Sequence, residues 1–172
     1  MKKLFAMMAM TGLLLSSISA CAQQDKSKRP SPPASVSETV GGTKITIDYS
    51  QPSLKGRELG KDIEPKDGKV WRAGANEKTW IEFSKDVTIE GKPLAAGKYG
   101  FFTIKNGNDW TLIFSKKWEG WGTQYNESDD ALRVNVKQGA AGASEEKLTY
   151  SISKAGVVTL AWGTMRVGFK VK

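Results

Sequence analysis

The sequence predicts an all-β protein, an antiparallel β-sandwich of about nine or ten short strands in a single domain. Most of residues 35–172 consists of short segments in which apolar and polar side chains alternate, the pattern of half-buried strands. Pairs rich in glycine and asparagine separate these segments, and such pairs form tight turns. No segment keeps the period of an amphipathic helix over three turns. Many short strands between turns are typical of a sandwich or a barrel.

The predicted domain opens with a hairpin between residues 35–40 and residues 43–49. Gly41 and Gly42 lie between the two segments, and glycine readily adopts the positive φ that a primed turn needs. Residues 50–70 follow as a long polar loop with several prolines and glycines. A loop of this length in a compact domain is usually functional or contains an unrecognised element.

Eight further strands are expected, separated by turns or glycine-rich loops. They cover residues 79–83, 87–89, 99–104, 110–114, 132–136, 148–152, 157–162 and 165–171. Turns are predicted at residues 90–93 and 106–109, and the tryptophan-rich segment 118–125 is predicted as a loop.

The first twenty residues have the three parts of a secretory signal peptide. Lys2 and Lys3 form its positive end, residues 4–15 form an uncharged apolar core, and small residues follow up to Ala20. The apolar run is shorter than the ~20 residues needed to cross a bilayer, so a transmembrane anchor is disfavoured. We therefore expect residues 1–20 to be removed on export.

The segment Ile18-Ser19-Ala20-Cys21 resembles a lipobox, the processing site of bacterial lipoproteins. In proteins of that kind the cysteine is acylated and the chain is cut before it. Cys21 is the only cysteine of the chain, so it has no partner for an internal disulfide. We predict that Cys21 carries lipid, that residues 21–34 form an unfolded proline-rich tether, and that residues 35–172 form the domain.

A lipid anchor makes the bilayer the first expected partner, followed by a polysaccharide or an envelope protein. The tether lacks the acidic cluster that directs some lipoproteins to the cell surface. Ala22 also differs from the aspartate of an inner-membrane retention signal. We therefore expect the protein at the outer membrane, lipid-anchored and facing the periplasm.

Charge and composition disfavour several classes of function. The net charge is +8, but 21 of the 26 basic residues are lysines spread along the chain, which is typical of solvated surfaces. Without histidine, the chain has neither a Ser–His–Asp triad nor a histidine-based zinc site. We expect no nucleic-acid partner, no cofactor, no bound metal and no enzymatic activity.

Several motifs, in order along the chain, resemble a bacterial family known as domain of unknown function 2911. The motifs are residues 47–57, 70–77, 83–100, 102–104, 110–111 and 132–134. The resemblance spans about residues 35–171, and residues 61–67 depart from it by being acidic and rich in lysine. It implies an exported, often lipid-anchored β-sandwich without an established activity, and it implies no catalytic residues.

The segment 71–77 concentrates groups that recognise ligands, namely Trp71, Arg72, Asn76 and Glu77. An aromatic ring, a guanidinium, an amide and a carboxylate beside a flexible glycine suit a sugar or a carboxylated ligand. In the structural alternative, Trp71 plugs one end of the sandwich and Arg72 pairs with Glu77. We favour this alternative and predict that Arg72 and Glu77 are partners.

Trp118, Trp121 and Tyr125 form the second candidate site. Exposed rings there would form a platform for sugars, whereas buried rings would fold the loop over an apolar edge. A carboxylate-dependent hydrolase would need two carboxylates across a cleft, and Glu77 and Glu82 are the pair to consider. The sequence thus favours a membrane-anchored binding or envelope-structural module, ahead of a carbohydrate-binding protein and a hydrolase.

Overall fold

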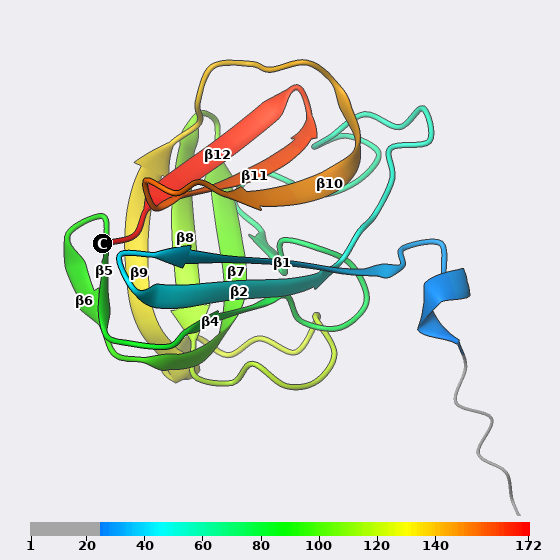
Figure 1. The fold of residues 1–172 in the computed structure, drawn as a ribbon. Helices are drawn as coiled ribbons and strands as arrows, with labels where there is room; N and C mark the ends of the chain where they lie inside the picture. Colours follow the sequence, from blue (N-terminus) through cyan, green and yellow to red (C-terminus); the bar gives the residue numbers. More distant parts are fainter. Residues whose placement is uncertain (1–24) are drawn as a thin grey trace, which may run out of the picture.

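The computed structural model describes residues 25–172, so the predicted signal peptide and Cys21 lie outside the described residues. Residues 25–172 form one domain of twelve strands, and this part of the chain contains no α-helix (Figure 1). The strands are β1 (Pro33–Val40), β2 (Thr43–Ser50), β3 (Val70–Trp71), β4 (Trp80–Phe83), β5 (Val87–Ile89), β6 (Lys92–Leu94), β7 (Gly97–Asn106), β8 (Asp109–Ser115), β9 (Asp130–Lys137), β10 (Glu145–Ile152), β11 (Val157–Gly163) and β12 (Met165–Lys170). Two single-turn 3-10 helices are η1 (Lys26–Lys28) and η2 (Glu127–Asp129). Among the described helices, none has the length and apolar character needed to cross a membrane.

Seven strands form one antiparallel sheet in the order β1-β2-β4-β7-β8-β9, with β3 also paired to β7. β7 has ten residues, and its two halves have different neighbours on the side away from β8. Its first half, from Gly97, pairs with β4, and its second half pairs with β3 through Thr103 and Ile104. As in any pleated sheet, successive residues of each strand point alternately into the core and outward.

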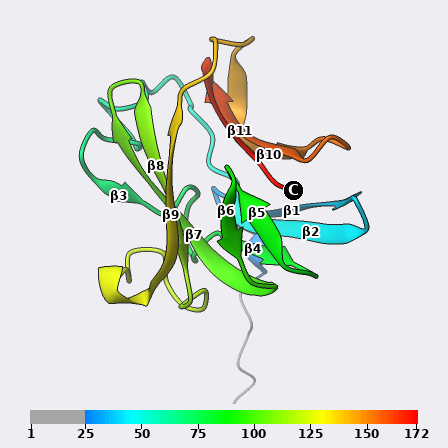
Figure 2. The same cartoon turned by 90° about the vertical axis from the view of Figure 1, so that its left-hand side faces the viewer.

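A three-stranded sheet of β10, β11 and β12 packs over the large sheet, and β5 and β6 form a separate hairpin. The outer strands of the three-stranded sheet contact the two edge strands of the large sheet: β10 contacts β1, and β12 contacts β9. Figures 1 and 2 show the small sheet lying across the open side of the curled large sheet. The two sheets enclose one core between them, which confirms the predicted all-β sandwich.

Apolar side chains from both sheets meet in this core, among them Ile45 of β2 and Leu160 of β11. Phe101, Phe114 and Phe169 lie at its centre, with ring centroids 5.4, 5.7 and 5.8 Å apart. Burying a phenylalanine side chain stabilises a fold by about 1.5–3 kcal/mol. This aromatic cluster is therefore a main contact between the two sheets.

A second, smaller apolar cluster lies on the outer face of the large sheet. Phe102 of β7 and Ile113 of β8 are opposite each other, outside the main core, yet both are fully buried. The loop between β8 and β9 supplies the cover, because Tyr125 packs against Phe102 with ring centroids 5.0 Å apart. This loop is thus fixed to the outer face, where it also builds part of the candidate site.

The predicted glycine hairpin is confirmed, and two strands are additional to those predicted. Gly41 and Gly42 have φ angles of 56° and 81°, as a primed turn requires. The two unpredicted strands are β3 and β6. β3 has only two residues at the end of the long loop, and β6 contains Pro93, which disfavours a strand except at an edge.

The domain begins earlier than the sequence predicts. β1 starts at Pro33, and the carbonyl of Pro32 accepts a hydrogen bond from the amide of Gln51 at 2.8 Å. Proline is tolerated there because it opens an edge strand. Pro33 and Ala34, which the sequence assigns to the tether, therefore lie in β1.

Candidate functional site

A cleft of about 270 Å³ lies on the outer face of the large sheet, next to the start of β1. Its volume is slightly below the ~300–1,000 Å³ of typical ligand sites. Strands β2 and β4, the loop after β8 and the N-terminal segment each form part of its wall. We call it the outer cleft, and its lining residues are Lys26, Arg29, Pro33, Asp48, Tyr49, Ser50, Glu77, Lys78, Trp80, Trp118, Glu119 and Gly120.

The floor of the outer cleft follows from the register of the strands. Asp48 of β2 lies opposite Trp80 of β4, and Trp80 lies opposite Gly100 of β7. At Gly100, a Cβ atom would lie 2.9 Å from the carbonyl of Lys117 and 3.3 Å from Cα of Trp118. Because Gly100 has no side chain, the loop after β8 lies directly on the sheet, which brings Trp118 over β7.

The two tryptophans of the outer cleft meet edge to face. The ring centroids of Trp80 and Trp118 are 6.3 Å apart, and their planes are inclined by 70°. The ammonium of Lys98 lies 3.9 Å from the centroid of Trp80 and 4.4 Å from that of Trp118, in the range of cation–π contacts. This geometry offers a single ring for stacking and differs from a coplanar aromatic platform.

Two polar groups of the outer cleft have hydrogen-bonding capacity left over. Among the described residues none donates a hydrogen bond to the carboxylate of Asp48, and burial raises the pKa of this group. Lys78 is buried, and its ammonium donates one hydrogen bond of 2.9 Å to the carbonyl of Lys117. An ammonium has three donors, so the cleft presents both an acceptor and a donor to a ligand.

Glu77 binds the N-terminal segment to the rim of the outer cleft. Its carboxylate accepts hydrogen bonds of 2.9 and 3.1 Å from Nη1 of Arg29 and lies 3.1 Å from Nζ of Lys26. The hydrogen bond from Arg29, supported by Lys26, lowers the pKa of Glu77 from 4.5 to about 2. Beside it, the amide of Asn76 donates to the carbonyl of Ser31 at 2.9 Å. The N-terminal segment is thus attached to the domain at two neighbouring points.

Arg72 and Glu77 are not partners, so the predicted ion pair is wrong. Glu77 bonds the N-terminal segment, whereas Arg72 lines a second, more open cleft of about 360 Å³ near Glu64. Between them, Ala73 and Asn76 have left-handed φ angles of 48° and 53°. These residues redirect the backbone, and the two side chains face different clefts. Nε of Arg72 is buried and makes no hydrogen bond to any described residue.

Trp71 is part of the core, in line with the structural alternative for segment 71–77. It is 3% exposed and stacks on Trp162, with ring centroids 6.0 Å apart and planes inclined by 16°. Its Nε1 donates to the carbonyl of Gly74 at 3.2 Å. The ring therefore fills space between the sheets and is not free to stack on a ligand.

Trp121 lies at the rim of the outer cleft, outside its lining. It is 48% exposed, the most exposed large apolar side chain of residues 25–172. Its backbone forms an isolated antiparallel bridge with Glu77, and the next amide, of Gly122, donates to the carbonyl of Asn76 at 3.0 Å. A Cβ atom on Gly122 would lie 1.9 Å from Cδ of Arg72, so only glycine fits. These contacts hold Trp121 beside Glu77.

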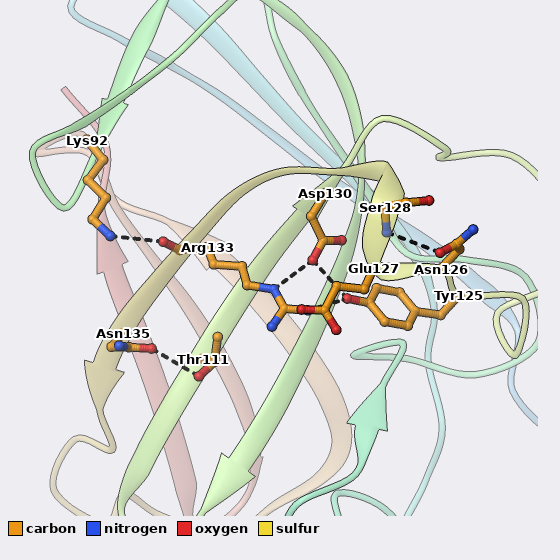
Figure 3. Close-up of polar contacts among 9 residues, drawn as sticks. All are labelled: Lys92, Thr111, Tyr125, Asn126, Glu127, Ser128, Asp130, Arg133 and Asn135. Carbon is orange, nitrogen blue, oxygen red and sulfur yellow. Dashed lines mark hydrogen bonds and ion pairs between the residues drawn. The ribbon is translucent and has the colours of Figure 1, made fainter.

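Tyr125 belongs to a polar network away from the outer cleft (Figure 3). Its hydroxyl donates to Oδ2 of Asp130 at 2.8 Å and accepts from Nη2 of Arg133 at 2.7 Å. Burial, together with the bond to Asp130, raises the pKa of Tyr125 to about 12. The network joins the loop after β8 to β9. Tyr125 therefore holds this loop in place, away from the outer cleft.

Of the residues singled out from the sequence, the structure brings Glu77 and Trp118 together in the outer cleft. Asp48, Lys78 and Trp80 are among the lining residues that the sequence did not single out. Asp48 and Trp80 lie in strands, and Lys78 lies two residues before β4. Single polar or aromatic residues at such positions are ordinary and carry no signal of a site. Glu82, the other half of the carboxylate pair considered for hydrolysis, lies outside the lining.

No curated protein and no solved structure matches the chain. A family model described as a protein of unknown function (DUF2911) matches residues 31–171. This range contains the lining of the outer cleft except Lys26 and Arg29, and it begins two residues before β1. It covers most of the chain and nearly the whole domain. The chain therefore belongs to the DUF2911 family.

Proposed function

We propose that this chain is a lipid-anchored bacterial envelope protein whose domain binds a small hydroxylated ligand, such as a single sugar ring, in the outer cleft. The anchor is supported by the lipobox-like segment that ends at Cys21. The periplasmic side of the outer membrane is supported by Ala22 and by the lack of an acidic cluster in the tether. The domain acts as a binding module without a catalytic step of its own.

The ligand proposal rests on the joint presence of an aromatic ring, an unpaired acceptor and a buried donor in one cleft. Trp118 supplies the ring, Asp48 the acceptor and Lys78 the donor. A sugar has an apolar face that stacks on an aromatic ring and hydroxyls that both donate and accept hydrogen bonds. The volume of about 270 Å³ limits the ligand to a small one.

Calorimetric titration of the domain with glucose and with N-acetylglucosamine tests this proposal. Asp48→Asn and Trp118→Ala should each weaken binding by about tenfold, or ~1.4 kcal/mol. The first replaces a charge-assisted hydrogen bond by a weaker neutral one, and the second removes the stacking ring. Glu82→Gln is the matched control, since Glu82 lies two residues from Trp80 on the same face of β4 but outside the cleft.

The sugar proposal is contradicted if the wild-type domain binds neither sugar. It is also contradicted if Asp48→Asn and Glu82→Gln proteins bind with the same affinity. Trp121→Ala tests whether the rim of the cleft takes part in sugar binding. We expect this substitution to leave the affinity for the sugar unchanged, because Trp121 is outside the lining.

Membrane partitioning tests the anchor. Full-length protein produced in a lipoprotein-processing bacterium should pellet with membranes and enter the detergent phase, because acyl chains bind bilayers stably when more than one is present. Cys21→Ala protein should be soluble after signal removal or remain uncleaved. Processed Cys21→Ala protein that still partitions like the wild type would show that Cys21 is not the anchor.

One observation favours a second function, carboxylate-dependent hydrolysis of a glycosidic bond. Asp48 and Glu77 both line the outer cleft, where burial raises the pKa of Asp48 while Arg29 lowers that of Glu77 to about 2. Opposite shifts suit acid and base roles, but the carboxylate of Glu77 is already bonded to Arg29 and Lys26. Turnover of nitrophenyl glycosides, abolished by Asp48→Asn and by Glu77→Gln, would establish hydrolysis, whereas an inactive wild type would rule it out for these substrates.

A further inference from the structure

We propose that the rim of the outer cleft, with Trp121 at its tip, docks onto the bilayer that holds acylated Cys21. The cleft then opens at the membrane surface. This inference rests on the lipid anchoring proposed above. Its occupant is the headgroup region of the bilayer, and three observations support it.

The first observation is where the described chain begins. Asp25 follows Cys21 by four residues, which span at most ~14 Å even when fully extended. The next residue, Lys26, is already bonded to Glu77, and Arg29 forms hydrogen bonds with the same carboxylate. The side of the domain that carries Glu77 is therefore the side nearest the lipidated residue.

The second observation is the position of Trp121. It is 48% exposed, and its backbone pairs with that of Glu77, so it lies on the side where the N-terminal segment is attached. Tryptophan prefers the boundary between headgroups and acyl chains, where its apolar ring is buried and its N–H stays near water. The ring is thus placed on the one side of the domain that the anchor holds against a bilayer.

The opposite end of the domain offers a comparison. Val157 is 38% exposed and follows Gly156. Gly156 lies against Val40, at the far end of β1, because a Cβ atom added to Gly156 would be 3.1 Å from the Val40 side chain. Figure 1 shows η1 and the C-terminal end of the chain on opposite sides of the domain, and Gly156 also contacts Val171. Val157 therefore lies far from the membrane in the proposed orientation.

The third observation is charge. The loop between β8 and β9, which carries Trp121, has two exposed lysines, Lys116 and Lys117, and two exposed acids, Glu119 and Glu127. Glu127 is paired with Arg133 at 3.2 Å, which offsets its charge. On the neighbouring segment, the carboxylate of Glu77 is neutralised by Arg29. The docking side thus lacks the excess of negative charge that anionic headgroups would repel, and its lysines suit an anionic surface.

The test uses the full lipidated chain reconstituted into vesicles of phosphatidylethanolamine and phosphatidylglycerol. Because Cys21 is blocked by its acyl group, a cysteine introduced by Trp121→Cys is the only free thiol and takes an environment-sensitive fluorophore. Val157→Cys is the matched control, and Thr123→Cys gives a second position in the exposed loop that keeps Trp121. Vesicle flotation of the unlabelled wild type is measured in parallel.

Probes at positions 121 and 123 should shift their emission to the blue on reconstitution and be quenched by lipids brominated near the headgroup, while the probe at 157 stays unchanged. If the protein floats with the vesicles but the loop probes remain as water-exposed as the control, docking is overturned and anchoring stands. A shift at all three positions shows no defined orientation and also overturns docking. Wild-type protein that does not float overturns the anchor, and docking with it.

Discussion

At the scale of single residues, the attachment of the N-terminal segment depends on Glu77. The side chains of Arg29 and Glu77 are 23% and 37% exposed, so water screens their attraction. A double-mutant cycle with Arg29→Ala and Glu77→Ala should therefore give a coupling energy of about 0.5–1 kcal/mol. Urea unfolding of a chain that starts at Ala22, after the proposed lipidation site, measures this energy.

The same cycle with Arg72→Ala in place of Arg29→Ala is the matched control. Arg72 has the same chemistry but lines the other cleft, so its effect and that of Glu77→Ala should add within ~0.5 kcal/mol. Coupling in the Arg72 cycle together with none in the Arg29 cycle would mean that Glu77 has a different partner in solution.

The lowered pKa of Glu77 predicts that acid removes part of the free energy of unfolding. Its folded pKa is about 2 and its ordinary value is 4.5, so the folded state favours the ionised carboxylate. This stabilisation is present above pH 4.5 and is lost as the pH falls towards 2. The stability difference between wild type and Glu77→Gln, measured by urea unfolding, should shrink over that interval. A difference that stays constant across it would contradict the lowered pKa.

The residues of segment 71–77 show what a sequence reveals at this scale. The burial of Trp71 could be predicted because large rings next to strands usually lie in cores. The partner of Glu77 could not, because Arg29 is 48 residues away and nothing in the sequence links the two positions. The left-handed Ala73 was equally unpredictable, since alanine rarely adopts a positive φ.

At the scale of elements, the loop after β8 keeps its position through glycines that admit close contacts. In Gly122→Ala, the new Cβ would lie 1.9 Å from Cδ of Arg72 and 2.8 Å from the carbonyl of Asn76. The loop must shift, and we expect a loss of about 1–3 kcal/mol in the free energy of unfolding, as for overpacked positions. Urea unfolding measures it.

Gly139→Ala is the control for this prediction. Its Cβ would meet nothing closer than the carbonyl of Arg166 at 3.5 Å, so the change in stability should stay within ~0.5 kcal/mol. Adding Arg72→Ala to Gly122→Ala removes one of the two clashing groups and should recover part of the loss. A Gly122→Ala protein as stable as the Gly139→Ala protein would show that the loop does not pack as described.

Elements with strong alternation and a glycine turn could be predicted, and the β1–β2 hairpin is the clearest case. β7 was also predicted, and its adjacent Phe101 and Phe102 indicate that both of its faces are covered. The sequence does not identify what covers the outer face. The cover comes from the loop after β8, whose path depends on contacts with β7 and with segment 76–78 that have no local pattern.

At the scale of the whole molecule, stability should depend on where an expressed chain begins. A chain of residues 35–172 lacks Pro33 and Ala34, which pair with β2, and the carbonyl of Pro32, which accepts a hydrogen bond from Gln51. We expect it to be about 1–3 kcal/mol less stable than residues 25–172, because several net hydrogen bonds are lost. Both chains should give a β-type circular dichroism spectrum.

Urea unfolding compares the two chains, and equal stability would mean that residues 25–34 do not pack on the domain in solution.

The single-domain sandwich itself could be predicted, because alternation recurs along the entire chain. The outer cleft could not, because it depends on β2, β4 and β7 being neighbours in the sheet, although β3 lies between β2 and β4 in sequence and pairs with the other half of β7. The order of strands in a sheet is set by packing of the whole chain and is not encoded in any one segment.

The direction of β1 determines how the domain would bear a force applied through the proposed lipid anchor. β1 begins at Pro33, on the side where the N-terminal segment is bonded to Glu77 and Asn76, and runs away from it to Val40, while β2 runs back. The hydrogen bonds between antiparallel strands are perpendicular to the strands, so a pull on the N-terminal end against the rest of the domain loads all of them together, in shear. A strand of opposite direction would be peeled off one bond at a time and would give way at a lower force. If Cys21 carries the proposed lipid, tension from the membrane would enter β1 at Pro33 and run along the strand, so the domain would resist unravelling.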